Sequence, residues 1–337
     1  MNSSNPVLVE VWRGDMVESR HHGAAAIVDA EGRVVESWGA VDHPVFARSA
    51  IKPLQALPLV ETGAAERYGL GDEEIALACA SHRGEPQHTE RVARWLQRVG
   101  LGPADLECGS HLPYHEATAQ ALIRVGEAPS SLHSNCSGKH SGFLTTAQHQ
   151  GEQTRGYIAP DHPVQRRVAR VLEEMSGLDL TRAPRGTDGC GIPVIGLSLH
   201  GMARAMARLG NPRGLNPDRA HAARRILDAM RNAPLMVSGT GAFASEVMSA
   251  AGAQVRVKPG AEGVYCAVLP GLGLGVALKI DDGAARASEV AMGAILLRLK
   301  ALDAPAQERL APKLAPIVKN IAGRDVGQIR AAALLAA

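Results

Sequence analysis

Runs of apolar residues at both ends of the chain predict β-strands, because they alternate with polar residues or lie between glycine-rich turns. Between Ser49 and about Ala251, apolar residues recur three or four positions apart, which predicts helices. The predicted strands span 7–12, 24–28, 33–38, 254–257, 263–269 and 274–280, and the clearest helices span 90–99, 116–125, 163–175, 219–230, 243–250 and 284–302. Thr89 is a candidate cap for the helix from Glu90, and Pro163 suits a first helical position.

Strands from both termini with helices between them predict an α+β fold. We expect one antiparallel sheet built from N- and C-terminal strands and covered by helices. The expected organisation is a single catalytic domain, 1–337, whose sheet comes from about 7–40 and 254–281 plus the C-terminal helix, and whose helical part covers about 49–251.

Composition narrows the classes of function. The 36 Lys and Arg residues against 34 Asp and Glu give a formal charge of only +2, and aromatic residues make up 3% of the chain. Nucleic-acid binding needs a dense basic face or stacking aromatic residues, so we expect no nucleic-acid partner. The 45% of hydrophobic residues is typical of a globular protein.

The amino terminus has no basic region followed by an apolar core and a cleavage site, so we expect a cytoplasmic protein. The longest uncharged run, 263–278, is broken by Pro270 and is shorter than the roughly 20 residues that cross a bilayer. We therefore expect no membrane partner. An odd number of cysteines at irregular separations fits a reducing compartment: Cys79, Cys108, Cys136, Cys190 and Cys266.

The first candidate chemistry lies in Arg48-Ser49-Ala-Ile-Lys52-Pro53. Ser49 and Lys52 are three residues apart, so on a helix they share a face, and a desolvated lysine can accept a serine proton. Penicillin-binding proteins and class A β-lactamases carry S-x-x-K at the start of a helix beside such a sheet. The plainer alternative is a capping serine and a surface lysine.

Two further segments are candidates for the same site. Ser81 lies in a polar, glycine-bearing segment that directly follows an apolar run, which is a common setting for a site loop or for an ordinary turn. Lys258-Pro-Gly260 ends a predicted strand, where the β-lactamase class carries K-T-G, and offers a second lysine. The S-D-N element of that class has no clean counterpart.

Two cysteine segments are candidates for a metal site: Ser134-Asn-Cys136-Ser-Gly-Lys139-His140 and Thr187-Asp188-Gly-Cys190-Gly-Ile-Pro193. Two thiolates favour zinc, and Lys139, His140, Asp188 or water can complete a tetrahedral set. Because neither segment has C-x-x-C spacing, two buried free cysteines are the alternative.

Several of these motifs together resemble those of the Rhizobium-type L-asparaginases, the asparaginase II group. They are Arg48-Ser49-Ala-Ile-Lys52-Pro53, Cys79-Ala-Ser81-His82, Asn135-Cys136-Ser-Gly-Lys139-His140, Asp188-Gly-Cys190-Gly191 and Lys258-Pro-Gly-Ala-Glu262-Gly263. Arg13-Gly14 and Glu18-Ser19-Arg-His21 near the start, and Asn320-Ile-Ala-Gly323 with Val326-Gly327 near the end, extend the resemblance to about 7–330. Pro259 and Val237-Ser-Gly239 depart from the pattern and bear on substrate preference.

The resemblance implies hydrolysis of L-asparagine to L-aspartate and ammonia on a fold similar to serine β-lactamases and glutaminases. By motif position, it implies Ser49 as nucleophile with Lys52 as base, and Ser81 with Lys258 as a second pair. It also implies a homodimer and a zinc site whose ligands are Cys136, Lys139, Cys190 and a water, with Asp188 close by.

The substrate carries an α-ammonium and an α-carboxylate, for which Asp188, Arg48 and His140 are candidates. Three alternatives stay open. One is another serine hydrolase, such as a glutaminase or esterase. Another is a non-catalytic module that binds an amino acid or zinc. The third is a cysteine amidase that uses Cys136 or Cys190 with His140.

Overall fold

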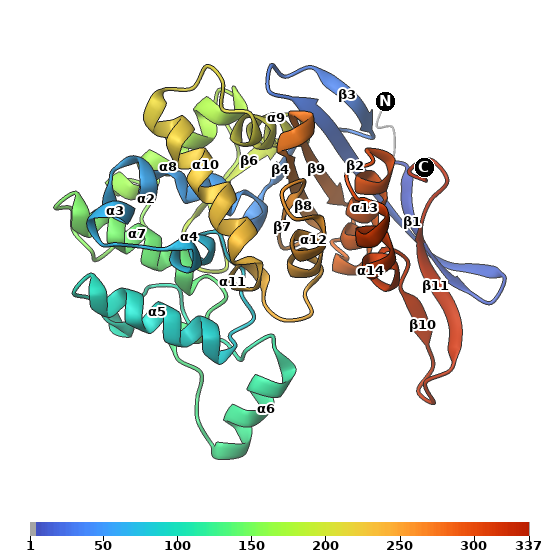
Figure 1. Cartoon of the computed structure of the whole chain (residues 1–337), viewed down its shortest axis with the longest axis horizontal. Coiled ribbons are helices and arrows are strands. Elements are labelled where there is room, and N and C mark those ends of the chain that lie inside the picture. The colour runs from blue at the N-terminus through green and yellow to red at the C-terminus, as the bar shows by residue number, and fades with distance from the viewer. Residues whose placement is uncertain (1–4, 337) are drawn as a thin grey trace. The chain divides into compact units, whose positions relative to one another are not determined.

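The computed structural model describes residues 5–336 and divides into two compact units. The first unit comprises residues up to 50, 197–211 and 246–337, so it is built mainly from the two ends of the chain. The second comprises 51–196 and 212–245. In Figure 1 the blue and red segments belong mostly to the first unit, and the green ones belong to the second.

The first unit contains the predicted antiparallel sheet. Its strand order is β10-β11-β1-β2-β9-β8-β7, and β3 pairs with the distal part of β2. The N-terminal and C-terminal halves meet where β2 pairs with β9, for example Ala26 with Ala277. The strands are β1 (Val7–Arg13), β2 (Met16–Asp29), β3 (Val34–Trp38), β7 (Arg256–Pro259), β8 (Val264–Leu269), β9 (Leu274–Ile280), β10 (Ile317–Lys319) and β11 (Asp325–Ala331). The predicted α+β class is therefore confirmed.

Helices cover the centre of this sheet. All six residues of β8 are buried, and since neighbouring strand residues point to opposite faces, both faces are covered. The helix α9 (Leu199–Gly210) packs on β2, β8 and β9, and α13 (Ala285–Arg298) packs on β1, β8, β9 and β11. A Cβ at Gly275 of β9 would lie 2.0 Å from the Ala203 oxygen, so glycine permits the close approach of α9.

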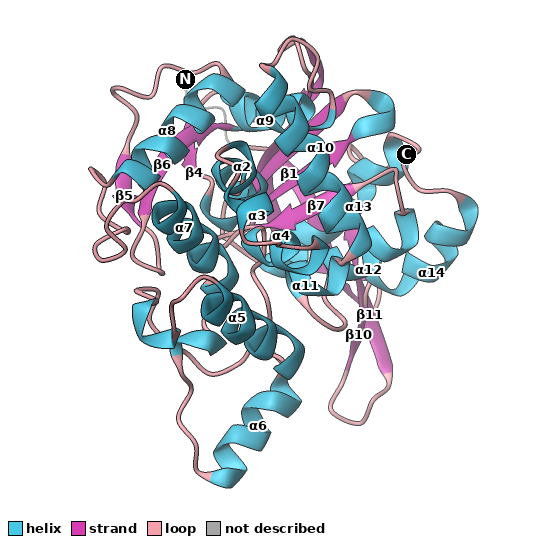
Figure 2. Cartoon of the chain, turned by 60° about the vertical axis from the view of Figure 1, so that its left-hand side comes forward, coloured by secondary structure: helices cyan, strands magenta, loops and turns pink. Residues whose placement is uncertain are grey.

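The second unit is mainly helical, and α7 (Ser137–His149) lies at its centre. Residues 137–147 of α7 are all buried, and the helix contacts α2, α3, α4, α5 and α8. Its other helices are α1 (Lys52–Gln55), α2 (Leu57–Glu61), α3 (Ala64–Arg67), α4 (Asp72–Ala78), α5 (Pro86–Arg98), α6 (Glu116–Val125), α8 (Pro163–Ser176), α10 (Pro217–Asn232) and α11 (Pro234–Ser238). Figure 2 shows these helices in cyan, with α6 set apart from the rest of its unit.

Three short strands and two further helices complete the elements used below. The hairpin of β5 (Arg185–Thr187) and β6 (Pro193–Ser198) joins antiparallel residues such as Gly186 and Val194. The strand β4 (Pro44–Phe46) precedes the first candidate motif. The helix α12 (Phe243–Ala251) leads from the second unit into the first, and α14 (Ala304–Leu314) follows α13.

Some element boundaries differ from the sequence-based prediction. The helix α5 begins at Pro86 with Glu85 as its N-cap, so Thr89 lies inside the first turn instead of capping the helix. Pro163 does occupy the start of α8, after His162 as N-cap. The predicted terminal helix ends at Arg298 instead of 302.

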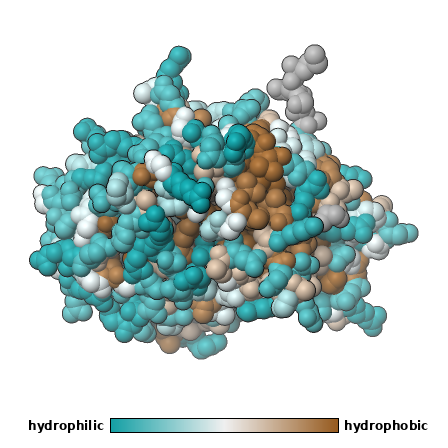
Figure 3. All heavy atoms as spheres, turned by 45° about the horizontal axis from the view of Figure 1, so that its top comes forward, coloured by the Kyte–Doolittle hydropathy of each residue, from teal (hydrophilic) through white to brown (hydrophobic). Residues whose placement is uncertain are grey.

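No helix among residues 5–336 is both long and apolar enough to cross a membrane. The face drawn in Figure 3 is mostly hydrophilic, with a single prominent patch of apolar side chains. All five cysteines are buried and free. The cysteines are therefore available as thiols for chemistry or metal binding.

Candidate active site

A buried lysine near the start of the second unit, Lys52, contacts two other candidate residues. Lys52, at the start of α1, is 0% exposed. Its Nζ donates to the carbonyl oxygen of Ala80, lies 3.0 Å from the Ser81 hydroxyl oxygen and lies 3.2 Å from the Cys136 sulfur. The structure thus brings Lys52, Ser81 and Cys136 together although 84 residues separate the first from the last.

Backbone hydrogen bonds fix the loop that carries Ser81. The helix α4 ends at Ala78, and the Ser81 amide then donates to the Val237 oxygen at 3.0 Å. The next amide, that of His82, donates to the Asn135 oxygen at 3.2 Å. The loop is therefore held between the end of α11 and the residue that precedes Cys136.

Close packing of α7 against α4 explains the glycine in the motif Cys136-Ser-Gly138-Lys139. A Cβ on Gly138 would lie 2.3 Å from the Leu77 oxygen, which is closer than any real contact. Glycine therefore lets the first turn of α7 rest on the last turn of α4, three residues before the loop that binds Lys52.

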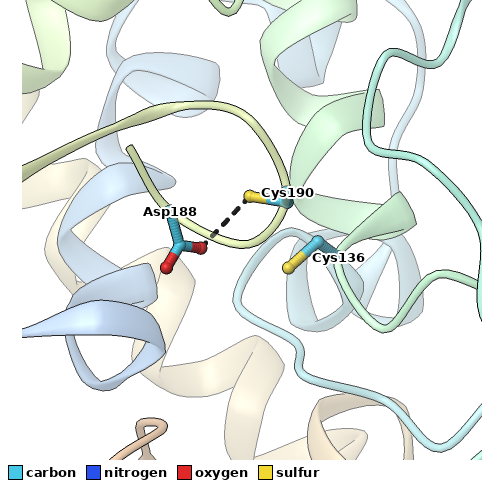
Figure 4. A group of neighbouring side chains, drawn as sticks. All are labelled: Cys136, Asp188 and Cys190. Atoms are coloured by element: carbon cyan, nitrogen blue, oxygen red, sulfur yellow. Dashed lines mark hydrogen bonds between the residues drawn. The ribbon is translucent and has the colours of Figure 1, made fainter. Parts of the chain in front are cut away.

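A second group of side chains consists of Cys136, Asp188 and Cys190, whose potential ligand atoms all lie within 4.8 Å of one another. Figure 4 shows the two sulfurs and the carboxylate turned toward one another. Asp188 and Cys190 lie in the tight turn between β5 and β6, where the Gly191 amide donates to the Asp188 oxygen and Gly191 has φ 89°. This is a candidate metal-binding group.

Lys139 adds an amine to this group. Its Nζ lies 2.9 Å from the Cys190 sulfur, and that sulfur lies 3.2 Å from an Asp188 oxygen. Lys139 is 2% exposed and lies in the first turn of α7, three residues after Cys136. The structure therefore assembles all three sequence-predicted ligand side chains, Cys136, Lys139 and Cys190, with Asp188 beside them.

The ionisable groups of this cluster shift one another's pKa values. A hydrogen bond from Cys190 lowers the pKa of Cys136 well below its usual range, and the ammonium groups of Lys139 and Lys52 act in the same direction against burial. Donating that bond and being buried raise the pKa of Cys190. Burial opposes a charge on Lys139, but the two sulfurs nevertheless raise its pKa.

His140 follows Lys139 on α7 and is 0% exposed. Its Nδ1 lies 2.7 Å from the hydroxyl oxygen of Tyr157, and that oxygen accepts a hydrogen bond from the Glu107 amide at 2.9 Å. Burial, and then the ammonium groups of Lys139 and Lys52, lower the pKa of His140 well below its usual range. Burial therefore disfavours the charged form of the His140 imidazole.

The remaining candidates, Arg48, Ser49 and Lys258, belong to the first unit. Ser49 lies half-buried in a short 3₁₀ turn, η1 (Arg48–Ile51), in which Arg48 has φ 49°. A non-glycine residue in the left-handed region stores strain, which is common at functional sites. A Cβ on Gly260 would lie 2.9 Å from the Ala47 oxygen, so the end of β7 packs directly on this turn.

Lys258 of β7 is 2% exposed, and its Nζ donates to the Pro259 oxygen at 2.8 Å. Within the first unit the structure therefore places the strand end that carries Lys258 beside the turn that carries Ser49. Within the second unit it places Lys52 with Ser81, a contact that the sequence motifs alone do not predict.

Tyr157 is the residue of this site that sequence reasoning missed. It is one of four tyrosines in the chain and lies in a polar loop between α7 and α8, where its complete burial leaves no periodic signal. The one sequence signal of order near Tyr157 is the capped start of α8, which follows a few residues later. Its contact with His140 becomes apparent only in three dimensions.

A buried lysine in contact with a serine hydroxyl, on an α+β scaffold, is typical of hydrolases that use serine as nucleophile. The family model described as L-asparaginase II matches residues 9–331. The chain therefore belongs to the L-asparaginase II family, and this membership implies an asparaginase-type hydrolase. A comparison with curated proteins gives no match.

Solved structures with similar folds include two β-lactamases and a protein named Mglu. The class C β-lactamase from Rhodobacter sphaeroides is 13% identical, with 82% of this chain and 94% of that chain covered and a TM-score of 0.42. The β-lactamase from Sulfitobacter sp. EE-36 is 16% identical, with 83% and 92% covered and a TM-score of 0.42. Mglu in its glutamate form is 15% identical, with 83% and 61% covered and a TM-score of 0.39. These likenesses are distant, so the assignment depends on the family.

Proposed function

We propose that the chain is an L-asparagine amidohydrolase that converts L-asparagine and water to L-aspartate and ammonia by serine–lysine chemistry. The observation that carries this proposal is the buried Lys52 amine 3.0 Å from the Ser81 hydroxyl oxygen, in a member of the L-asparaginase II family. That distance is within reach for proton transfer between the two groups.

Ser49 acts as the nucleophile and Lys52, three residues later in the chain, as its base. In its neutral form, Lys52 accepts the Ser49 proton while the serine oxygen bonds to the side-chain amide carbon of asparagine. The proton then passes to the amide nitrogen, the C–N bond breaks, and ammonia leaves. Water attacks the resulting ester, which gives the L-aspartate side-chain carboxylate and restores the Ser49 hydroxyl.

Ser81 and Lys258 form the second serine–lysine pair of the site. Because Ser81 also contacts Lys52, its hydroxyl can receive a proton from one lysine and pass it on. The end of β7, which carries Lys258, packs against the turn that carries Ser49, and this packing supports a role for Lys258 in the same reaction as Ser49. The Ser49 amide at the start of a helical turn is a candidate donor to the developing oxyanion.

The cluster of Cys136, Lys139 and Cys190 binds zinc, with Asp188 beside it. Zinc favours sulfur and nitrogen ligands in tetrahedral sites, and the observed set offers two sulfurs and an amine. The Cys190 thiol has one proton but two acceptors, the Cys136 sulfur and the Asp188 carboxylate, so the cluster is rich in electron pairs and suits a cation. Lys139 must lose a proton to ligate.

Zinc held there supplies a fixed positive charge that can anchor a carboxylate, since a separate serine nucleophile is already present. The protein side chains then determine how the amino acid lies. Asp188 is the candidate partner of the α-ammonium group, and Arg48 and His140 are candidate partners of the α-carboxylate. An L-asparagine ligand needs both signs of charge, and these three residues supply both.

The test is ammonia release from L-asparagine and from L-glutamine by the purified protein and by variants, with the metal content measured. We expect asparagine-selective release that Ser49→Ala abolishes, and about one zinc per chain. The matched control is Ser37→Ala, which changes an exposed serine of β3 and leaves release unchanged. Release from glutamine alone would favour a glutaminase, and release from neither amide would contradict the proposal.

A further inference from the structure

The carboxylate of Glu85 is buried four residues after Ser81, and no step of the proposed reaction uses it. Glu85 is 6% exposed. Its Oε1 accepts a hydrogen bond from the Thr240 amide at 2.8 Å, and its Oε2 accepts from the Thr240 hydroxyl at 2.6 Å. The side-chain amide of Gln87 also donates to Oε2, at 3.1 Å. These hydrogen bonds offset the cost of removing a carboxylate from water, and two of them come from Thr240.

The backbone before Thr240 is fitted to this carboxylate. Gly239 has φ 93°, a conformation that favours glycine, and a Cβ there would lie 2.5 Å from Oε1 of Glu85. Glycine therefore lets the chain come close enough for the Thr240 amide to reach Glu85. Thr240 itself is exposed, so its hydrogen bonds hold it on Glu85 and burial of its side chain does not.

A histidine makes a second link between the start of α5 and the same stretch of chain. His88 is 0% exposed, its Nδ1 accepts from the Glu85 amide at 3.2 Å, and its Nε2 lies 2.9 Å from the Leu235 oxygen. Because Nδ1 accepts, Nε2 carries the proton and donates to Leu235. The start of α5 thus binds this stretch at Leu235 and at Thr240.

Val237 lies between these two points of attachment and contacts the candidate active site. Its oxygen accepts from the Ser81 amide at 3.0 Å, and the Ser81 hydroxyl oxygen lies 3.0 Å from Nζ of Lys52. The position of Ser81 relative to Lys52 therefore depends on where the Val237 oxygen is held. A displacement of about 1 Å at a catalytic group can cost about a hundredfold in rate.

We propose that Glu85 is a positioning residue for Ser81: its carboxylate holds Thr240, and this contact fixes the Val237 oxygen that binds the Ser81 amide. Glu85 acts without contacting the substrate. This inference rests on the proposed asparaginase function, in which Ser81 passes a proton, and deepens it by naming the residue that keeps Ser81 in place. Burial alone would raise the pKa of Glu85, but the hydrogen bonds from Thr240 lower it below its usual value, so the carboxylate is ionised at neutral pH.

Hydrogen exchange of the Ser81 amide, followed by NMR, tests the contact without any substrate. Glu85→Ala removes both acceptors, and Thr240→Val removes the hydroxyl donor while it keeps the side-chain shape. We expect Ser81 exchange to become about tenfold faster or more in Glu85→Ala and several-fold faster in Thr240→Val, with the Leu144 amide of α7 unchanged. The matched control is Glu90→Ala on α5, at a side chain that is 64% exposed, which leaves both amides unchanged.

Ammonia release from L-asparagine distinguishes positioning from a general loss of structure. We expect Glu85→Ala to lower kcat by about 10–100-fold while KM stays within about twofold, and Glu85→Gln, which keeps one oxygen, to recover most of the rate. In a Ser81→Ala background, we expect Glu85→Ala to change kcat by less than about twofold, because its effect acts through Ser81. A merely structural role would lower kcat equally in both backgrounds.

Two results overturn the inference: Ser81 exchange in Glu85→Ala equal to that in Glu90→Ala, or a full loss of kcat that persists in Ser81→Ala. If Glu85→Ala does not fold, Thr240→Val at its exposed position decides through the same readouts. Failure of the proposed function is distinct, because it appears as absent ammonia release from the unaltered protein. In that case, or where Ser81→Ala releases no measurable ammonia, the exchange of the Ser81 amide decides alone.

Discussion

Gly138→Ala is expected to disturb the candidate active site although alanine adds only one methyl group. The new Cβ would lie 2.3 Å from the Leu77 oxygen and 2.8 Å from the Leu77 carbonyl carbon. A relaxed carbon–oxygen contact is about 3.3 Å, so α7 and the end of α4 must separate by about 1 Å. The Leu77 atoms are backbone, and no flexible side chain can absorb this shift.

The expected change in the free energy of unfolding is the difference between two opposing effects. Overpacking a well-packed core costs about 1–3 kcal/mol, whereas alanine gains at most about 1 kcal/mol over glycine in a helix. We therefore expect Gly138→Ala to lower the free energy of unfolding by about 1–2 kcal/mol. The larger effect is on activity, because Leu77 lies three residues before Ala80, whose oxygen binds Lys52. A shift of about 1 Å at catalytic groups can cost about a hundredfold in rate.

The assay pairs urea unfolding with ammonia release from L-asparagine. Gly142→Ala is the matched control, since it lies one helical turn later and its Cβ would meet Ala78 at an ordinary 3.4 Å. We expect that control to keep its activity and to be as stable as the unaltered protein or slightly more stable. If Gly138→Ala were as stable and as active as Gly142→Ala, the packing argument would be refuted.

Three further predictions follow from the same contacts. Lys52→Met removes the proposed base, and we expect kcat to fall by about 10²–10⁴-fold in steady-state assays while circular dichroism stays unchanged. Cys136→Ser and Cys190→Ser each remove a sulfur ligand, and we expect zinc measured by mass spectrometry to fall well below one per chain, whereas Cys266→Ser of β8 keeps it. Trp95→Phe loses the bond from Nε1 to the Thr145 hydroxyl oxygen and leaves a small void, so we expect a loss of about 1–3 kcal/mol in urea unfolding. An unchanged kcat would contradict the first prediction, an unchanged zinc content the second, and an unchanged midpoint of urea unfolding the third.

The sheet was predictable where its strands are buried. The strands β8 and β9 have continuous or alternating apolar residues because they lie at the covered centre. The strands β10 and β11 were not predicted, since two of the three residues of β10 are exposed and only Ile329 of β11 is buried. Figure 1 shows this hairpin extending from the edge of its sheet. The helix α14 lies in an alanine- and proline-rich stretch, 303–316, that gives a weak helical signal.

The central helix α7 escaped prediction for a different physical reason. It is buried on all sides and contains serine, glycine, threonine and histidine, so it has no apolar stripe with helical spacing. Such a helix is recognisable only from its neighbours. The candidate metal ligands at its start were nevertheless predictable from their residue types.

The residue types of the candidate site were predictable from the sequence, but their contacts were not. Serine, lysine and cysteine in short motifs indicated Ser81, Lys52 and Cys136 as candidates, because the chemistry requires those residue types. The contact between Lys52 and Ser81 was not predictable, since it depends on how α1 lies against the loop after α4. Tyr157 was missed because a single buried tyrosine in a loop has no sequence signature.

The side chain that carries the covalent intermediate identifies the nucleophile. The protein is mixed with L-asparagine, quenched with acid within milliseconds, digested and examined by peptide mass spectrometry. We expect an aspartyl ester on the peptide that contains Ser49 and no such ester in Ser49→Ala. An ester on Ser81, or a thioester on Cys136 or Cys190, would contradict the assignment of Ser49 as the nucleophile.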